Sequence, residues 1–318
     1  MNRLTLTFAL LAALAGASAL AADYPDKPIL FVVPFAAGSA TDVLARVLGQ
    51  EIAVESKQKV VVDDKPGASG MIGAQAVAKA APDGYTAFVT TNTTHAANQH
   101  LYKQLPYDAV ADFAPVAGLA EGYQILVVNS HVPAKKVSDI VAWAKKNPGK
   151  LTFGEGSSSA RVAVELFQQM TGTKLVHVPY KSNPLAITDL LGGHIDMMIV
   201  DIPTGLPQVQ AGKLTGIAVT SRERLPQIDL PTVSEAGVKG YEMSYWFAAY
   251  LPAKTPTPVV RRLNELLVKA VGSDAAKAFF AKSALTPFTT TPDELAKFQA
   301  AETEKWGRII KAAGIQPE

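Results

Sequence analysis

The sequence predicts an α/β protein with two lobes, each built on a mostly parallel sheet flanked by helices. Three observations support this fold class. Strand-like and helix-like segments alternate along the chain, an order typical of parallel sheets with helices packed on them. Most strand-like segments are continuous apolar runs, which indicates strands that are covered on both faces. The chain has 318 residues, which suggests about two domains at roughly 150 residues each.

The strand candidates are short apolar runs spread over the first two thirds of the chain. They cover residues 29–33, 60–62, 85–90, 124–128, 151–153, 175–178, 195–200 and 214–220.

The helices between these strands carry start and stop signals. Asn183 and Pro184 indicate an N-cap followed by proline at the first helical position, and a pair of glycines ends that helix. Thr291 and Glu294 predict a capping box at the start of a long final helix.

Apolar residues at helical spacing predict which helix faces enter the core. In the helix that begins near Asp42, this face carries Val43, Leu44, Val47 and Leu48. In the final helix it is interrupted by Glu302 and carries Leu295, Phe298, Trp306, Ile309 and Ala313.

Residues 1–21 predict a cleavable export signal. Arg3 supplies the positive start, residues 4–14 an apolar core, and Ala19-Leu20-Ala21 an A-x-A cleavage site. The alternative is an uncleaved anchor helix, but a membrane span needs about 20 apolar residues and this core is shorter. We expect cleavage near Ala21 and an exported, periplasmic protein.

Composition limits the classes of partner. The chain has no cysteine, so an exported form must be held by its core without disulfides. Its formal net charge of +2 falls to +1 when Arg3 is removed, and the charges are interspersed. Binding of nucleic acid or membrane through bulk charge is therefore not expected. We expect a monomer.

Two stretches, around residues 118–124 and 238–246, indicate crossings between the lobes. The predicted division gives one discontinuous lobe from residues 22–122 and 241–318, and a second from residues 123–240. Ligands of such folds bind between the lobes, at the carboxyl ends of strands.

The loop at residues 34–42 follows the first strand and opens a helix. Gly38 can adopt positive φ and lets the backbone approach a ligand, while Ser39 and Thr41 add hydroxyls. Such a loop directs backbone N–H groups at one spot, where an anion can bind against the positive end of the helix. Ordinary strand–turn–helix capping is the alternative. The other binding candidates of this loop are Phe35, Ala37 and Asp42.

The loop at residues 154–159 has the same position after a strand and before a helix. Its candidates are one glycine and three consecutive hydroxyls, Gly156, Ser157, Ser158 and Ser159. It lacks the third glycine of G-x-G-x-x-G and contains no G-x-S-x-G, so neither a dinucleotide fingerprint nor a nucleophile elbow is indicated. Two such loops could face each other across a cleft.

Three charged or phenolic residues have open roles. Arg161, in the first turn of a helix, either pairs with Glu165 or holds a ligand carboxylate. Tyr180 either faces the ligand or packs. Asp201, at the end of a strand, either orients the ligand or caps the next turn.

Enzyme and metal signals are poor. None of the five histidines shows metal-ligand spacing, and without cysteine a structural zinc site is not expected. No nucleophile–base pair and no Walker loop is present, so we expect no enzyme activity, cofactor or metal.

These segments together resemble the Bug (TctC-type) periplasmic solute-binding receptors of tripartite tricarboxylate transporters. The motifs span the mature chain and include YPDKPI at residues 24–29, VPFAAGSATDVLAR at 33–46, KPGASGMIGAQAVAKAAPDGYT at 65–86, HVPYKS at 177–182, DLLGGHIDMM at 189–198, AGKLTGIAVTSRERLP at 211–226 and KWGRIIKAAGI at 305–315.

The resemblance implies a periplasmic-binding-protein (Venus-flytrap) fold that closes on a small organic anion. It also implies that the two loops hold a carboxylate, that Tyr180 and Asp201 lie near the cleft, and that the receptor serves a permease of one large and one small subunit. This chain departs from the family pattern at Ser39, at Arg161 and in a shorter second loop.

The resulting hypothesis is a periplasmic receptor for a small carboxylate, a dicarboxylate or an aromatic acid if Arg161 faces the cleft. The alternatives are a receptor for an amino acid or neutral solute, with Asp201 as the discriminating residue, and an exported serine hydrolase using residues 157–159. The hydrolase would need a histidine within hydrogen-bond reach. A role in presenting the closed receptor to a membrane sensor is compatible with the first hypothesis.

Overall fold

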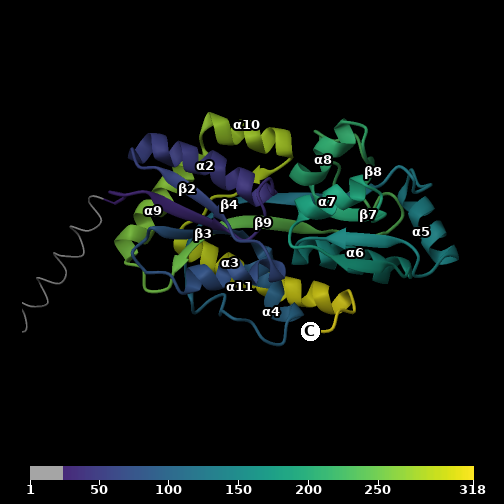
Figure 1. Ribbon diagram of the computed structural model, residues 1–318, viewed down its shortest axis with the longest axis horizontal. Coiled ribbons are helices and arrows are strands. Elements are labelled where there is room, and N and C mark those ends of the chain that lie inside the picture. Colours follow the sequence, from purple (N-terminus) through teal and green to yellow (C-terminus); the bar gives the residue numbers. More distant parts are fainter. Residues whose placement is uncertain (1–23) are drawn as a thin grey trace, which may run out of the picture.

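A single mixed sheet runs through both lobes of the computed structural model, which describes residues 24–318 (Figure 1). The main strand order is β2 (Val60–Asp64), β1 (Ile29–Val33), β3 (Thr86–Thr91), β9 (Ser244–Pro252), β4 (Phe113–Val128), β7 (Met197–Asp201), β5 (Thr152–Glu155) and β6 (Val176–Pro179). Two further strands pair with β4 alone, namely β8 (Thr215–Val219) and β10 (Thr286–Pro287).

Strand β4 belongs to both halves of the sheet. From Phe113 to Tyr123 it pairs antiparallel with β9, and from Gln124 to Val128 it pairs antiparallel with β7 and β8. The parallel pairings lie on either side of it, in β2–β1–β3 and in β6–β5–β7. The predicted lobe boundaries remain a prediction.

Two strand segments were not anticipated in the sequence. The first part of β4 contains Pro115, Gly118 and Gly122, which are residues that usually indicate turns. Gly118 lies in this strand, paired with β9, and a side chain does not fit there because a Cβ would lie 2.7 Å from the Phe288 ring. The second segment is β9, which begins at Ser244, inside the stretch 238–246 that was predicted as a crossing between the lobes.

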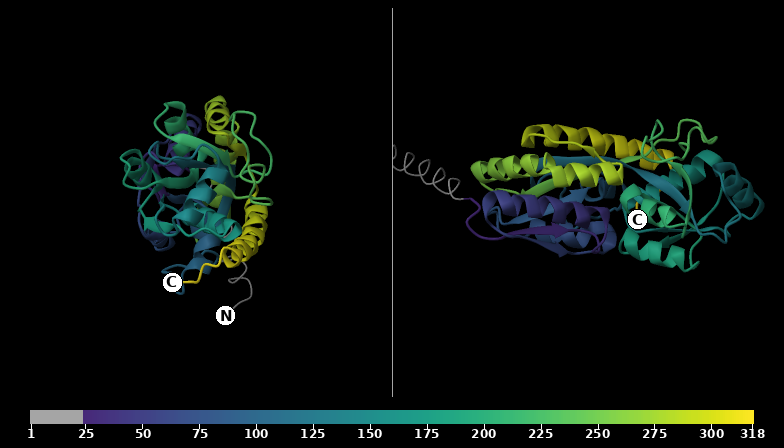
Figure 2. Two further views of the ribbon diagram at one scale, coloured as in Figure 1. Left: turned by 90° about the vertical axis from the view of Figure 1, so that its right-hand side faces the viewer. Right: turned by 90° about the horizontal axis from the view of Figure 1, so that it is seen from above.

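Helices cover both faces of the sheet. They are α2 (Ala40–Ser56), α3 (Met71–Ala78), α4 (Asn98–Leu101), α5 (Val137–Lys146), α6 (Ser158–Thr171), α7 (Asn183–Leu191), α8 (Ile202–Gln210), α9 (Thr257–Val271), α10 (Asp274–Ser283) and α11 (Pro292–Ala312). In Figure 1, α2, α10, α7 and α8 lie above the sheet, and α3, α4, α11 and α6 below it. Seen from above, the two lobes lie side by side along the long axis (Figure 2).

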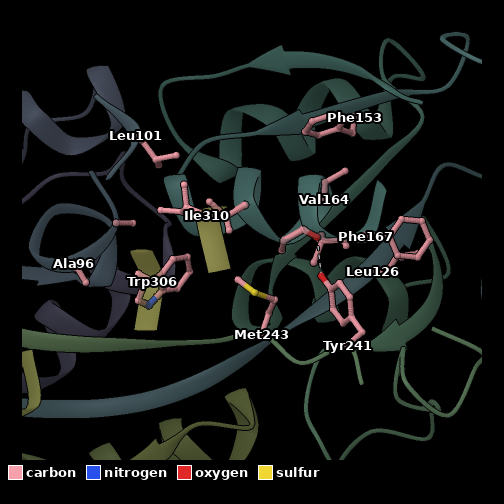
Figure 3. Packing of buried hydrophobic residues seen from close by; sticks show 14 of the residues in the cluster. Ala96, Leu101, Leu126, Phe153, Val164, Phe167, Tyr241, Met243, Trp306 and Ile310 are labelled. Carbon is pink, nitrogen blue, oxygen red and sulfur yellow. Dashed lines mark hydrogen bonds between the residues drawn. The ribbon is translucent and has the colours of Figure 1, made fainter. Parts of the chain in front are cut away.

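The core below the sheet is continuous between the lobes. Figure 3 shows Trp306 and Ile310 of α11 between Leu101 of α4 on one side and Phe167 of α6 on the other. Tyr241 closes this cluster by donating a hydrogen bond to the Ala163 carbonyl at 2.7 Å. Helix α11 therefore packs against elements of both halves of the sheet.

The predicted capping box of the final helix is confirmed, but its predicted buried face is only partly right. Thr291 and Glu294 make both hydrogen bonds of the box. The buried face turns toward Leu295, Gln299, Glu302, Trp306 and Ile310, whereas Phe298 and Ile309 are half-buried.

Glu302 is part of the core face because its carboxylate has partners there. One oxygen accepts from Trp246 Nε1 at 3.2 Å, and the other is 2.9 Å from Lys305 Nζ. A buried carboxylate is stable in such a place only when it is hydrogen-bonded or paired.

The start of α7 differs by one residue from the prediction. Ser182, and not Asn183, is the N-cap, and Asn183 is the first helical residue. Proline is tolerated at either of the first helical positions, so the sequence signal did not fix the register.

Among the described residues, no helix is long and apolar enough to cross a membrane. The predicted export signal, residues 1–21, lies outside the described residues.

We predict that Glu302→Ala lowers the melting temperature, because it leaves Trp246 Nε1 buried without an acceptor. An unsatisfied buried donor costs about 1–3 kcal/mol. Thermal unfolding followed by circular dichroism checks this. Glu302→Gln keeps an acceptor oxygen and should lose less; equal loss in both variants would contradict the assignment.

Candidate ligand-binding site

A cavity lies between the two halves of the sheet. Residues that follow or belong to strands of the first half line one wall: Phe35, Ser39, Ala40, Thr41, Thr91, Tyr245 and Phe247. The opposite wall comes from the second half: Ser157, Ser159, Ser182, Asn183 and Asp201.

Four helix N-termini meet at this cavity. The N-cap residues of α2, α6, α7 and α8 all line it, and they are Ser39, Ser157, Ser182 and Asp201. Each of these helices follows a strand, so the carboxyl ends of β1, β5, β6 and β7 are directed to the same place. Helix N-termini carry partial positive charge and unpaired N–H groups, which favour an anion.

Asp42, in the first turn of α2, fixes the first loop by hydrogen bonds to Gly38 and Ser39. Gly38 has φ +79° and donates its N–H to Asp42 Oδ2 at 2.8 Å, while Asp42 N donates to Ser39 Oγ at 3.2 Å. The other carboxylate oxygen of Asp42 lies 2.7 Å from Arg46 Nε. Asp42 and Gly38 therefore shape the loop, and Ala37 lies exposed at its tip.

The second loop is fixed by its serines and by a close backbone approach. Ser157 Oγ accepts from Ala160 N at 3.3 Å and lies 3.2 Å from Ser159 Oγ. Gly156 donates its N–H to Asn183 Oδ1 at 2.9 Å. A Cβ at Gly156 would lie 1.9 Å from the carbonyl carbon of Ser182, so no other residue fits this backbone.

Hydrogen bonds join the two walls directly. Ala36 N donates to Ser182 Oγ at 3.1 Å, and Ser158 Oγ donates to Asn98 Oδ1 at 2.7 Å. These contacts link the first loop and α4 with elements of the second half of the sheet. The structure thus has the lobes in contact around the cavity.

Asp201 caps the next helix, which was one of the two roles considered for it, and it also lines the cavity. Its Oδ1 accepts from Thr204 N at 3.0 Å and caps α8, and its Oδ2 accepts from Asn183 Nδ2 at 2.7 Å beside the cavity. Burial raises the pKa of this carboxyl, while the hydrogen bonds from Thr204 and Asn183 act in the opposite direction.

Arg161 and Tyr180 line a separate cavity, together with Glu155 and His177. Arg161 forms its ion pair with Glu318 and not with Glu165. The Tyr180 hydroxyl donates to Asp189 Oδ2 at 2.7 Å. Burial and the Asp189 carboxylate raise the pKa of Tyr180 to about 12.

Several lining residues were not among the candidates from sequence. Ser182 and Asn183 had a local signal, since they follow a strand and precede a proline-started helix as the two predicted loops do. Tyr245 and Phe247 had none, because they belong to β9, which was not anticipated. Thr91 and Ala40 complete this group.

The geometry does not support a hydrolase. Ser158 donates to Asn98, and no hydrogen bond within residues 24–318 joins Ser157, Ser158 or Ser159 to a histidine. His177 is paired with Glu155 Oε1 at 2.9 Å in the other cavity. In this part of the chain, no group of three or more His, Cys, Asp or Glu side chains could hold a metal.

A carboxyl pair lies behind the first loop. Asp64 Oδ2 is 3.3 Å from Arg46 Nη2, and Arg46 also pairs with Asp42. Burial and the nearby Asp42 charge raise the pKa of Asp64 to about 6, although Arg46 acts against this.

A family model described as "Tripartite tricarboxylate transporter family receptor" (TctC) matches residues 44–315. Protein BugT of Bordetella pertussis (strain Tohama I) is 34% identical over 322 residues, which cover 99% of this chain and 99% of that protein.

Solved structures of similar proteins share the fold. R. palustris Rpa4515 with adipate has a TM-score of 0.90 at 34% identity, covering 93% of this chain and 100% of that one. The periplasmic binding protein BugD has a TM-score of 0.89 at 29% identity, covering 93% and 100%. MatC (Rpa3494) from Rhodopseudomonas palustris with bound malate has a TM-score of 0.84 at 27% identity, covering 90% and 100%. The predicted periplasmic-binding-protein fold is confirmed.

We predict that Gly156→Ala displaces the second loop and lowers both melting temperature and ligand affinity, because its Cβ would overlap the Ser182 backbone. Differential scanning fluorimetry measures the loss. Gly272→Ala is the control: Gly272 has φ −79°, and its Cβ would meet nothing closer than 3.5 Å. Equal behaviour of the two variants would show that the loop yields easily.

A pH prediction concerns Asp64. Its folded-state pKa is raised from 3.8 to about 6, so its contribution to stability is complete below pH 3.8 and is lost as pH rises through about 6. The melting temperature of wild type minus that of Asp64→Asn should therefore be larger at about pH 4 than at about pH 7.5.

Asp108→Asn is the control with the opposite sign, because N–H groups of Ala111 and Val110 lower the pKa of Asp108. Its stabilising contribution is lost as pH falls. A wild-type-minus-mutant difference at Asp64 that grows with pH would contradict the prediction.

Proposed function

Because the chain belongs to the family of tripartite tricarboxylate transporter receptors, we propose that it captures a small organic carboxylate between its lobes and delivers it to a membrane permease. The observation that carries this proposal is the meeting of four helix N-termini at one hydroxyl-lined cavity. No lysine or arginine is among the residues that line this cavity in the described chain. The positive potential for the anion comes instead from peptide dipoles and N–H groups.

A carboxylate suits this environment. Its oxygens accept several hydrogen bonds at once, and the serine and threonine hydroxyls can rotate to donate to it. A hydrogen bond to an ionised group is stronger than one between neutral groups, so few contacts suffice for selection. The names of two similar structures also support this ligand class, since one holds adipate and the other malate.

The sequence favoured a dicarboxylate or an aromatic acid as the ligand only if the Arg161 side chain faces the cleft. Arg161 lines a different cavity and pairs with Glu318, so it gives no reason to favour these ligands. The dicarboxylates of the similar structures are now the argument for a dicarboxylate.

In this proposal the two lobes close on the ligand, because the residues that line the cavity come from both lobes. We assign residues 22–122 and 241–318 to one lobe and 123–240 to the other, so a ligand in the cavity contacts both. A ligand drives closure only through its greater affinity for the closed form. The contacts Ala36–Ser182 and Ser158–Asn98 are available to that form.

The proposed location is the periplasm, and the proposed partner is a permease with one large and one small subunit. The protein acts as a monomer in this proposal and uses no cofactor.

A receptor for an amino acid is the second candidate, because Asp201 places a carboxylate beside the cavity. An amino acid has both a carboxylate for the helix N-termini and an ammonium for Asp201. A neutral solute would leave the helix N-termini without an anion.

We predict that thermal-shift screening of residues 22–318, purified through unfolding to remove carried ligand, finds stabilising carboxylates. The panel spans mono-, di- and tricarboxylates, aromatic acids and amino acids, with their neutral amides as matched controls. A ligand at about 100 times its dissociation constant adds about 2.7 kcal/mol of stability. Calorimetry confirms each hit. Stabilisation by the amides and by none of the acids would overturn the proposal.

A further inference from the structure

Tyr245 places an unused hydroxyl at the ligand cavity. Its side chain is 4% exposed and lines the cavity. The hydroxyl has no hydrogen-bond partner among the described residues. A buried hydroxyl without a partner is costly, so one that persists in a binding cavity indicates a partner that arrives with the ligand.

The sheet register places Tyr245 and Asp201 on the two strands that flank one short segment of β4. On β4, Gly122 is paired with Tyr245 of β9 and Gln124 with Asp201 of β7. Residues two apart on a strand point to the same face, and directly paired residues share a face. Tyr245 and Asp201 therefore flank β4 on one face, and both line the cavity.

The two side chains offer complementary hydrogen-bonding groups. Burial and the charge of Asp201 raise the pKa of the Tyr245 phenol well above its usual value, so the phenol keeps its proton. Asp201 Oδ1 and Oδ2 each accept one bond from the protein, and a carboxylate oxygen can accept another. Together they present a donor and an acceptor to the same cavity.

We propose that Tyr245 and Asp201 form a subsite for a hydroxyl or ammonium group on the bound carboxylate. A ligand hydroxyl can accept from Tyr245 and donate to Asp201, and an ammonium donates to both. The preferred ligands are then hydroxy- or amino-substituted acids, and the unsubstituted acids bind more weakly. This inference rests on the proposed function, since it assumes that a carboxylate occupies the cavity.

Matched acids test the subsite without changing the carbon skeleton. Each carboxylate that binds in the screen is compared by calorimetry with its unsubstituted, hydroxy and amino counterparts, as in succinate, malate and aspartate. We expect a substituted acid to bind at least about tenfold more tightly than its parent, equal to about 1.4 kcal/mol. Whether the hydroxy or the amino acid leads identifies the group that the subsite takes.

Two variants test whether the difference in affinity between substituted and unsubstituted acids depends on Tyr245 and Asp201. Tyr245→Phe removes only the hydroxyl, and Asp201→Asn keeps an N-cap residue that helices favour, so both should fold. The advantage of a hydroxy acid should fall at least about tenfold in Tyr245→Phe, and that of an amino acid by at least as much in Asp201→Asn.

Matched controls remove the same groups elsewhere. Tyr85→Phe deletes a hydroxyl that contacts Asp26, and Asp189→Asn changes the acceptor of Tyr180; neither Tyr85 nor Asp189 lines this cavity. Both controls should keep the wild-type ranking of ligands. Melting of the ligand-free proteins shows whether each variant is folded.

The outcomes separate this inference from the proposed function. Parent acids that bind as tightly as their substituted forms, or a ranking unchanged in both variants, overturn the subsite and leave the receptor for carboxylates standing. Absence of binding by every acid overturns the proposed function, and the subsite with it.

Discussion

The position of the cavity depends on one strand, β4, which carries both halves of the sheet. Its two ends pair with different neighbours, so β9 and β7 meet beside the same short segment, residues 122–124. The strands further out, β1, β5 and β6, direct their carboxyl ends toward this junction, and the helices that follow begin there. The cavity lies where β4 changes its pairing partners, and four helix N-termini surround it.

In the proposed function, this arrangement attracts an anion although no lysine or arginine among the described residues lines the cavity. A buried lysine or arginine would pay a large desolvation penalty whenever the cavity was empty. Helix N-termini are already fixed by their hydrogen bonds, so they lose no side-chain entropy when an anion binds. The one carboxylate among the described residues of the wall, Asp201, accepts hydrogen bonds from Thr204 and Asn183.

The sequence revealed the parts of the site that are contiguous. A strand, a short loop with glycine and serine, and a helix occur together at residues 34–42 and 154–159, and six candidates, Phe35, Ser39, Thr41, Ser157, Ser159 and Asp201, do line the cavity. Tyr245 could not be found this way, because its place depends on pairing across β4. Arg161 was ambiguous because its direction depends on Glu318, far away in the sequence. Pro115, Gly118 and Gly122 concealed the first part of β4, and at the two glycines a Cβ would lie within 3 Å of Phe288 or Leu285.

Gly156 sets a limit on how a receptor of this build can be retuned. The backbone of the second loop contacts the start of α7 at Gly156. Any side chain at this position would push the loop and α7 apart. Changes of ligand preference must therefore come from side chains on a fixed frame, such as Ser159 and Tyr245. For a biosensor made from this protein, a library over those wall positions, with Gly156 left untouched, would vary the analyte and retain the close contact between the second loop and α7.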